Sequence, residues 1–184
     1  MRFLLSLLLF FPSIIAAQEI THINADLTGD GVPDRAILAL DAERDDADLL
    51  IYVPNSDGQF ALRAEAKSVV WVGGIGQQPE LSVTPHGSLQ VISMNESIGR
   101  NRWHQTLTIA WRNDMFVLAG YTYEWYDTLN VSENGKCDVN LLTGKGEISW
   151  GEEFENKSTF RTKSRGSPID MWDREPPTEC FPDN

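Results

Sequence analysis

The chain has 184 residues, of which 41% are hydrophobic, so it is long and apolar enough for one folded domain with a sizeable core. Its formal net charge of −12 argues against nucleic acid or an anionic membrane surface as the partner, because both attract basic proteins. After the N-terminal region no apolar segment is long enough to span a bilayer, so we expect no membrane span.

The N-terminal 17 residues have the pattern of a secretory signal peptide. Arg2 gives a positive start, residues 3–11 form an apolar run, and small residues end the segment at Ala17. The run is too short for a helix across a hydrocarbon core of about 30 Å, and Pro12 argues against the alternative of a buried helix. We predict cleavage after Ala17, a secreted or periplasmic location, and a single mainly β domain over residues 18–184 with an irregular C-terminal tail.

Residues 26–34 have the spacing of a calcium-binding loop. Oxygen-bearing side chains occupy the first, third, fifth and ninth positions, Gly31 directly follows the fifth, and the seventh residue can contribute its carbonyl oxygen. Ca²⁺ binds roughly six to eight oxygen atoms, and alternate residues of a tightly curved loop can direct their oxygens inward. The predicted calcium ligands are Asp26, Thr28, Asp30, Val32 and Asp34.

This loop and the apolar stretch after it resemble the D-x-D/N-x-D-G-x-x-D element of secreted FG-GAP and VCBS-type repeats, in which the loop binds Ca²⁺ and precedes a strand. The resemblance covers Asn24 to about Val53, and because the sequence holds no second copy, we do not expect a full propeller. Ile37 stands where an EF-hand has glutamate, which excludes that motif. Thr28 stands where the family prefers Asp or Asn, so we predict a weak structural calcium site with a Kd of about 10⁻⁴–10⁻³ M. A metal-free turn is the alternative.

Short apolar stretches separated by turn residues predict an antiparallel meander of hairpins. Long helical periodicity is absent, and only residues 170–173 suggest a single helical turn. The expected fold class is therefore mainly β, sandwich- or barrel-like, with little helix. The predicted strands are residues 35–40, 49–53, 59–63, 68–71, 81–83, 89–93, 103–111, 115–125, 137–143, 147–150 and 160–163.

The strongest β signal is a hairpin formed by residues 103–111 and 115–125. They flank Asn113 and Asp114, two residues that tolerate the positive φ of a two-residue turn. This turn pairs Arg112 with Met115, and an unbroken register would then pair Trp111 with Phe116, Ile109 with Leu118, Leu107 with Gly120 and His104 with Tyr123.

In that register one face of the hairpin is an apolar core side and the other combines polar and aromatic residues. Aromatic rings beside hydrogen-bonding groups can bind a sugar, a peptide or a partner protein, because they offer apolar area with polar tips. The same spacing is also typical of the inner layer of a sandwich or barrel, and this alternative stays open. The predicted binding surface comprises Arg102, His104, Tyr121, Tyr123 and Trp125.

The two cysteines, Cys137 and Cys180, predict a disulfide that tethers the C-terminal tail, because exported proteins enter oxidising compartments. Two buried free thiols are the alternative. No catalytic residue is assigned, since the three histidines lack zinc-ligand spacing and no serine lies in a G-x-S-x-G turn.

These features favour an exported, non-catalytic binding or envelope-interaction module that contains a structural calcium loop. Its expected partner is a protein or a glycan in the exported compartment. An exported hydrolase with an unrecognised site and an inhibitor or immunity-type protein are the alternatives. A hydrolase would have a deep pocket with convergent polar groups, whereas a binding module would present a shallow aromatic strip.

Overall fold

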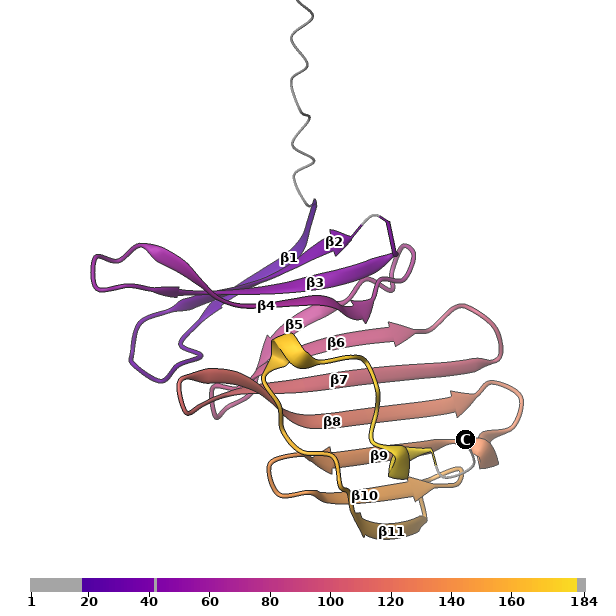
Figure 1. Cartoon of the computed structure of the whole chain (residues 1–184). Helices are drawn as coiled ribbons and strands as arrows, with labels where there is room; N and C mark the ends of the chain where they lie inside the picture. Colours follow the sequence, from indigo (N-terminus) through magenta and orange to yellow (C-terminus); the bar gives the residue numbers. More distant parts are fainter. Residues whose placement is uncertain (1–17, 42, 182–184) are drawn as a thin grey trace, which may run out of the picture.

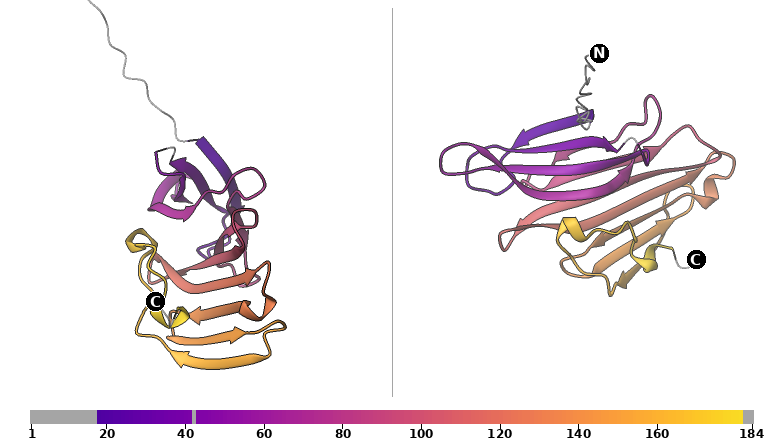
Figure 2. Two further views of the ribbon diagram at one scale, coloured as in Figure 1. Left: turned by 90° about the vertical axis from the view of Figure 1, so that its right-hand side faces the viewer. Right: turned by 45° about the horizontal axis from the view of Figure 1, so that its top comes forward.

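The computed structural model describes residues 18–41 and 43–181, and the predicted signal peptide at residues 1–17 lies outside them. The described residues form two antiparallel sheets, which confirms the mainly β fold class (Figure 1). The smaller sheet contacts the larger one at strands β5 and β6, and two further views show this sandwich-like arrangement (Figure 2). None of the helices in the described ranges has the length and apolar character needed to cross a membrane.

The smaller sheet has the strand order β1-β2-β3-β4, with each strand next to its neighbour in sequence. Strands β2 and β3 occur where the sequence predicts them, whereas residues 59–63 and 68–71 belong to one long strand. Register shifts between β3 and β4 interrupt the alternation that would have identified a continuous strand. The strands are β1 (Gln18–Ala25), β2 (Asp34–Asp41), β3 (Asp46–Pro54) and β4 (Phe60–Trp71).

Strand β1 is absent from the sequence-based prediction, and a bulge explains why. Its pairing with β2 shifts between Glu19 and Thr21, so the apolar residues Ile20 and Ile23 fall three positions apart. Both nevertheless pack against the core. A period of two therefore cannot be recognised in this strand, although it is β throughout.

The larger sheet has the order β11-β10-β9-β8-β7-β6-β5, again a simple meander. Strand β11 begins earlier than predicted, and β9 ends earlier because Gly144, with φ of +69°, closes a turn after it. Three short 3-10 helices are η1 (Val131–Glu133), η2 (Ile169–Met171) and η3 (Thr178–Cys180). The strands are β5 (Glu80–Val83), β6 (Leu89–Asn95), β7 (Asn101–Arg112), β8 (Met115–Asp127), β9 (Gly135–Asn140), β10 (Lys145–Trp150) and β11 (Asn156–Arg161).

The turn of the β7–β8 hairpin agrees with the prediction. Asn113 and Asp114 have φ of 49° and 60°, as a two-residue hairpin turn of type I′ requires. The pairs Arg112–Met115, Trp111–Phe116 and Ile109–Leu118 are all present.

Beyond these pairs the predicted register is wrong, because β8 contains a bulge at Ala119. Thr108 pairs with Gly120, so Leu107 lies opposite Tyr121 and not opposite Gly120. His104 likewise lies opposite Glu124 and not opposite Tyr123. One extra residue moves every later side chain of a strand to the other face. The bulge therefore decides where the aromatic residues of β8 point.

Residues 162–181, here called the C-terminal strap, cross one face of the larger sheet (Figure 1). The Leu118 amide donates a hydrogen bond to the Ser167 carbonyl oxygen at 2.8 Å. The Trp172 indole donates to the Val69 carbonyl oxygen at 3.3 Å, which connects the strap to β4. The predicted disulfide between Cys137 and Cys180 is present and joins the strap to β9.

The two sheets and the strap share one hydrophobic core. Strands of the smaller sheet, strands of the larger sheet and η2 all contribute side chains that are at most 1–2% exposed. Burial of these apolar groups is the main stabilising contribution in such a fold. Representative members are Leu38, Leu49, Ile51, Leu107, Ile109, Leu118 and Ile169.

Candidate functional site

A row of aromatic rings lies on the face of the larger sheet that the strap crosses. Tyr121, Tyr123 and Trp125 alternate along β8, and the bulge places them on this face. The centroids of the Tyr123 and Trp125 rings are 6.0 Å apart. Trp103 of β7 lies opposite Trp125, with its ring centroid 6.0 Å from that of Tyr123. Phe181 of the strap contacts Tyr123 edge-on at 5.1 Å. Aromatic rings at these distances and angles stabilise one another.

An open groove runs between these rings and the strap, and it has two connected chambers. The inner chamber has a volume of about 270 Å³ and the outer chamber about 500 Å³. Trp103, Tyr123 and Phe181 line both chambers. We call this feature the aromatic groove. The inner chamber is also lined by Trp71, Ser93, Gln105, Tyr121, Arg174 and Pro176, and the outer one by Arg100, Asn101, Arg102, Trp125, Tyr126, Asp127, Asn130 and Glu133.

A buried hydroxyl group without a hydrogen-bond partner lies in the wall of the inner chamber. Ser93 is 1% exposed and follows Leu89 and Val91 on the inward face of β6, where an apolar residue would be expected. Its Oγ atom has no hydrogen-bond partner among the described residues. Gln105 lies directly opposite Ser93 on β7 and lines the same chamber. An unpaired buried hydroxyl is destabilising unless something satisfies it, so this position is unusual for a purely structural wall.

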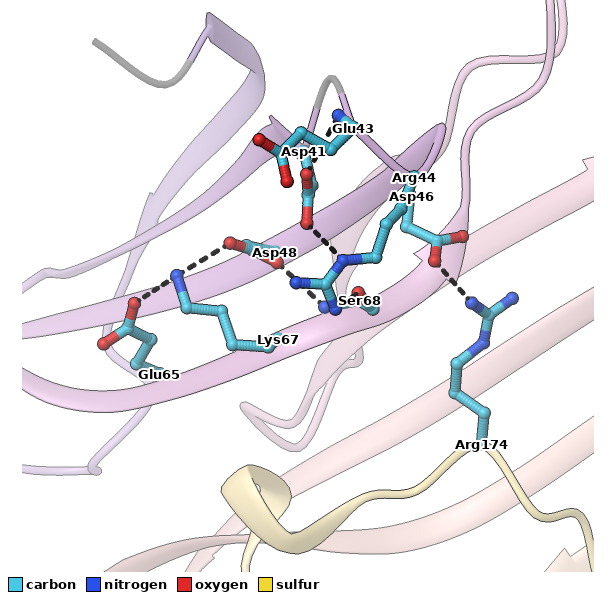
Figure 3. A network of polar contacts seen from close by, with 9 residues as sticks. All are labelled: Asp41, Glu43, Arg44, Asp46, Asp48, Glu65, Lys67, Ser68 and Arg174. Carbon is cyan, nitrogen blue, oxygen red and sulfur yellow. Dashed lines mark hydrogen bonds and ion pairs between the residues drawn. The ribbon is translucent and has the colours of Figure 1, made fainter. Parts of the chain in front are cut away.

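The positive charge of the inner chamber is neutralised within the protein. Arg174 Nη1 lies 2.7 Å from a carboxylate oxygen of Asp46 at the start of β3 (Figure 3). The same figure shows Lys67 between Asp48 and Glu65, with Nζ to oxygen distances of 2.8 and 2.6 Å. Hydrogen bonds to these two carboxylates raise the pKa of Lys67. Arg174 and Lys67 are therefore each paired with carboxylates of the protein itself.

A positive charge in the lining of the outer chamber is likewise neutralised by an ion pair. Arg100 Nη2 lies 2.6 Å from an Asp127 carboxylate oxygen, and its hydrogen bond and charge lower the pKa of that carboxyl. Arg102 contributes a different feature, because its Nη1 atom is buried and has no hydrogen-bond partner among the described residues. Arg102 alternates with Trp103, however, so its side chain is on the face of His104, where its charge helps to lower the pKa of Glu96.

The structure brings together three of the five residues of the predicted binding surface on the groove face. Tyr121, Tyr123 and Trp125 point into the groove, although Tyr121 is only 2% exposed, whereas Arg102 borders the outer chamber but alternates with Trp103 as His104 does. His104 does not belong to this group: it alternates with Trp103 and therefore lies on the opposite face. The prediction that all five share one surface fails because the unbroken register ignored the bulge.

On the opposite face His104 belongs to a small polar cluster. Its Nε2 atom contacts one carboxylate oxygen of Glu96, and the hydroxyl of Tyr126 donates to the other. Burial by itself raises the pKa of Glu96, but the hydrogen bonds from Tyr126 and His104 outweigh it and the pKa is lowered. The hydrogen bond to Glu96 also raises the pKa of Tyr126. The cluster holds residue 96 against β7 and β8.

Most groove residues are absent from the sequence-based site, and five of them show why. Trp71, Ser93 and Phe181 come from segments far from the hairpin, so only the fold brings them close. Trp103 and Gln105 are on β7 itself, but in a register without the bulge they lie on the opposite face from Tyr123 and Trp125. Gly120 within a long strand was the available signal, because an interior glycine often marks a bulge.

The predicted calcium loop connects β1 to β2. Several of its carboxylate oxygens already accept hydrogen bonds from main-chain amides of the loop. Asp26 accepts hydrogen bonds from the amides of Gly29 and Gly31 at 2.7 and 2.9 Å. Asp34, which is 0% exposed, accepts from the amides of Leu27 and Thr28 at 2.9 Å through its Oδ2 atom. These bonds hold the loop in a tight curve.

Two buried oxygen atoms in this loop lack a hydrogen-bond partner among the described residues, Asp34 Oδ1 and Thr28 Oγ1. Burial raises the pKa of Asp34 in spite of its two amide bonds, and the charge of Asp30 adds to the increase. Within the described part of the chain, no three His, Cys, Asp or Glu side chains are grouped so that they could hold a metal ion. The oxygen-only donor set is of the type that Ca²⁺ prefers, and calcium binding by this loop stays a prediction.

No family model matches the chain, and neither the curated proteins nor the solved structures searched include a match. The resemblance of residues 24–53 to FG-GAP and VCBS-type repeats therefore stays a prediction, and the function is argued from the geometry of the groove and the loop.

Proposed function

We propose that this protein is an exported, non-catalytic binding module and that its ligand, a glycan or a protein segment, occupies the aromatic groove. The observation that carries the proposal is the groove itself, an open channel lined by several aromatic rings and by Ser93, whose buried hydroxyl has no hydrogen-bond partner among the described residues. Ligand sites typically combine apolar and aromatic walls with a few placed polar groups. The disulfide supports export, because such bonds persist in oxidising compartments.

The shape of the groove favours binding over hydrolysis. Both chambers open to solvent along the strap, and their charged groups are paired with partners in the protein, as Arg174 is with Asp46 and Arg100 with Asp127. A hydrolase needs an acid, a base or a nucleophile directed at the bond to be cleaved. The cluster of Glu96, His104 and Tyr126 could supply such groups, but His104 lies on the opposite face of β7 from the aromatic row.

A matched pair of glycine variants tests this proposal. A Cβ atom at Gly135 would lie 2.0 Å from the Trp125 ring, so Gly135→Ala must displace Trp125 from the groove. At Gly74 a Cβ atom meets nothing within 4 Å, so Gly74→Ala is the control. We expect the purified protein to sediment with isolated envelope material of its host cells, Gly135→Ala to bind at least fivefold more weakly, and Gly74→Ala to bind normally.

Thermal melting of both variants is measured alongside, so that a loss of binding is interpreted only for folded protein. If Gly135→Ala is folded and sediments as well as the wild type, the groove does not hold the ligand. If no variant, wild type included, sediments with envelope material, the proposal of an envelope-interaction module is wrong.

We further propose that the loop of residues 26–34 binds one structural Ca²⁺ weakly. Asp26, Thr28, Asp30 and Asp34 would provide side-chain oxygens and Val32 its carbonyl oxygen. The raised pKa of Asp34 means that this carboxyl stabilises the folded state only while protonated, and that contribution is lost as the pH rises through the folded-state pKa. At neutral pH the ionised group therefore opposes folding, and a bound cation would offset that cost.

Calcium is expected to stabilise the protein by mass action, by about 2.7 kcal/mol at a hundredfold excess over Kd. Calorimetric titration and melting with millimolar CaCl₂ or with chelator measure this effect. Asp30→Ala is the informative variant, because Asp30 Oδ1 accepts only the Val32 amide at 2.8 Å and the side chain is exposed. Equal heats and equal melting shifts for the wild type and Asp30→Ala would exclude the site.

A further inference from the structure

We infer that the ligand of the aromatic groove is a neutral carbohydrate, with the Ser93 hydroxyl as a buried hydrogen-bonding anchor for one sugar ring. This inference rests on the proposed function and narrows it to one class of ligand. Its starting point is Ser93 Oγ, which is buried, unpartnered among the described residues, and part of the inner chamber wall.

The polar groups of the groove match hydroxyl groups. A hydroxyl both donates and accepts, and so do Ser93 through Oγ and Gln105 through its amide. A sugar presents such hydroxyls around an otherwise apolar ring of C–H groups, and that apolar part can pack against Trp71, Trp103 or Tyr123. A neutral sugar could therefore both pack against the aromatic rings and form a hydrogen bond with the unpaired Ser93 hydroxyl.

The charge of the groove favours a neutral ligand. Arg174 is paired with Asp46 and Arg100 with Asp127, so neither guanidinium is free for a carboxylate or phosphate. The charge of Arg102 is balanced by the nearby Glu96, whose pKa it helps to lower. An anionic ligand would have to break one of these pairs, and a cationic ligand would meet Arg100 and Arg174 in the lining.

The floor of the groove disfavours an extended peptide bound through its main chain. β7, β8 and β9 are internal strands of the larger sheet, so their amide and carbonyl groups are already paired in the ladder. A peptide added as a strand needs a free sheet edge. Only side chains are available here, and the inner chamber, at about 270 Å³, is just below the range of roughly 300–1,000 Å³ typical of small-molecule pockets. It suits a single ring, and the outer chamber can receive the residues that follow.

Intrinsic fluorescence provides the binding assay, because Trp71, Trp103 and Trp125 line the groove. The purified protein is titrated with neutral tetrasaccharides of α-1,4-glucose, β-1,4-glucose, N-acetylglucosamine and mannose, with a heparin tetrasaccharide as the anionic comparison and decaproline as the peptide comparison. We expect saturable binding of at least one neutral tetrasaccharide at micromolar to millimolar concentration and none of the heparin fragment.

Ser93→Ala is the decisive variant. It removes a hydroxyl that has no partner in the described part of the chain, so the melting temperature should be unchanged or higher, while one lost ligand hydrogen bond should weaken binding roughly three- to tenfold. Trp103→Ala should weaken binding at least tenfold. Trp150→Ala, which removes an exposed tryptophan outside the groove, should bind like the wild type.

The inference is overturned if no neutral tetrasaccharide binds at millimolar concentration, or if Ser93→Ala and Trp103→Ala both bind as tightly as the wild type. Binding of decaproline or of the heparin fragment alone would also overturn it, because the ligand would then be a peptide or an anion. In these cases the sedimentation of the wild type, and its loss in Gly135→Ala, would still support a binding groove. Failure of both experiments would remove the proposed function as well.

Discussion

Replacing Cys137 and Cys180 together by alanine is expected to lower the free energy of unfolding by about 4 kcal/mol. The disulfide spans 43 residues of sequence, and closing a loop of that length in the unfolded chain accounts for an effect of this size in the chain-entropy treatment. The residues between the cysteines include β10, β11 and most of the strap. Without the bond these elements gain freedom mainly in the unfolded state, so the folded state is disfavoured.

The disulfide adjoins the groove through Phe181, so its loss should be visible there. Cys180 is next to Phe181, whose ring contacts Tyr123 at 5.1 Å and Trp125 at 6.5 Å. If the end of the strap is held mainly by the bond, the double variant will show greater acrylamide quenching of tryptophan and weaker ligand binding, even at temperatures where it is fully folded.

Urea denaturation of the oxidised wild type and of the double variant measures the change, with equal m-values as the condition for comparing them. Reduced wild type is the control and should unfold with the midpoint of the variant. A difference below about 1 kcal/mol would mean that the strap is held by its packing against β4 and β8 instead, through contacts such as Trp172 with Val69.

Strands with a regular register could be predicted from the sequence, whereas bulges hid β1, divided β4 and shifted the predicted register of β8. β2, β3 and the turn of the β7–β8 hairpin follow from apolar runs and from residues that tolerate positive φ. β1 and the continuous β4 contain register shifts, which break the period of two on which the prediction depends. The local sequence pattern thus gives the correct bounds and pairing of a strand only where its register is unbroken.

The site was predictable in its aromatic part and not in its polar part. Tyr123 and Trp125 stand out in the sequence because they alternate on a strand. Ser93 has no such signal in the sequence. Its proposed role as a hydrogen-bonding anchor depends on a buried position beside Gln105 of another strand and on the strap that forms the other side of the groove. Contacts between segments distant in sequence depend on the topology of the fold. Among these contacts, the sequence suggested the pairing of Cys137 with Cys180, because the chain has two cysteines.

Tyr121→Ala is expected to destabilise the protein by about 3–5 kcal/mol, the range for removing a buried aromatic side chain. Tyr121 is 2% exposed, and its ring centroid lies 6.4 Å from that of Tyr123 and 6.3 Å from that of Trp172. Burial raises the pKa of its hydroxyl, in keeping with an apolar environment. Tyr121→Phe keeps the ring and should cost less than about 1 kcal/mol.

This pair of variants tests the bulge at Ala119 directly. In an unbroken register Tyr121 would lie on the face of Thr106, away from the strap, and its truncation would cost no more than a surface change of about 0.5 kcal/mol. Thr122→Ala is the matched control, because Thr122 occupies that outer face in the structure, opposite Thr106. A large effect at Tyr121 and a small one at Thr122 require the shifted register, whereas the reverse order would place the aromatic row outside the groove and remove the basis for a ligand there.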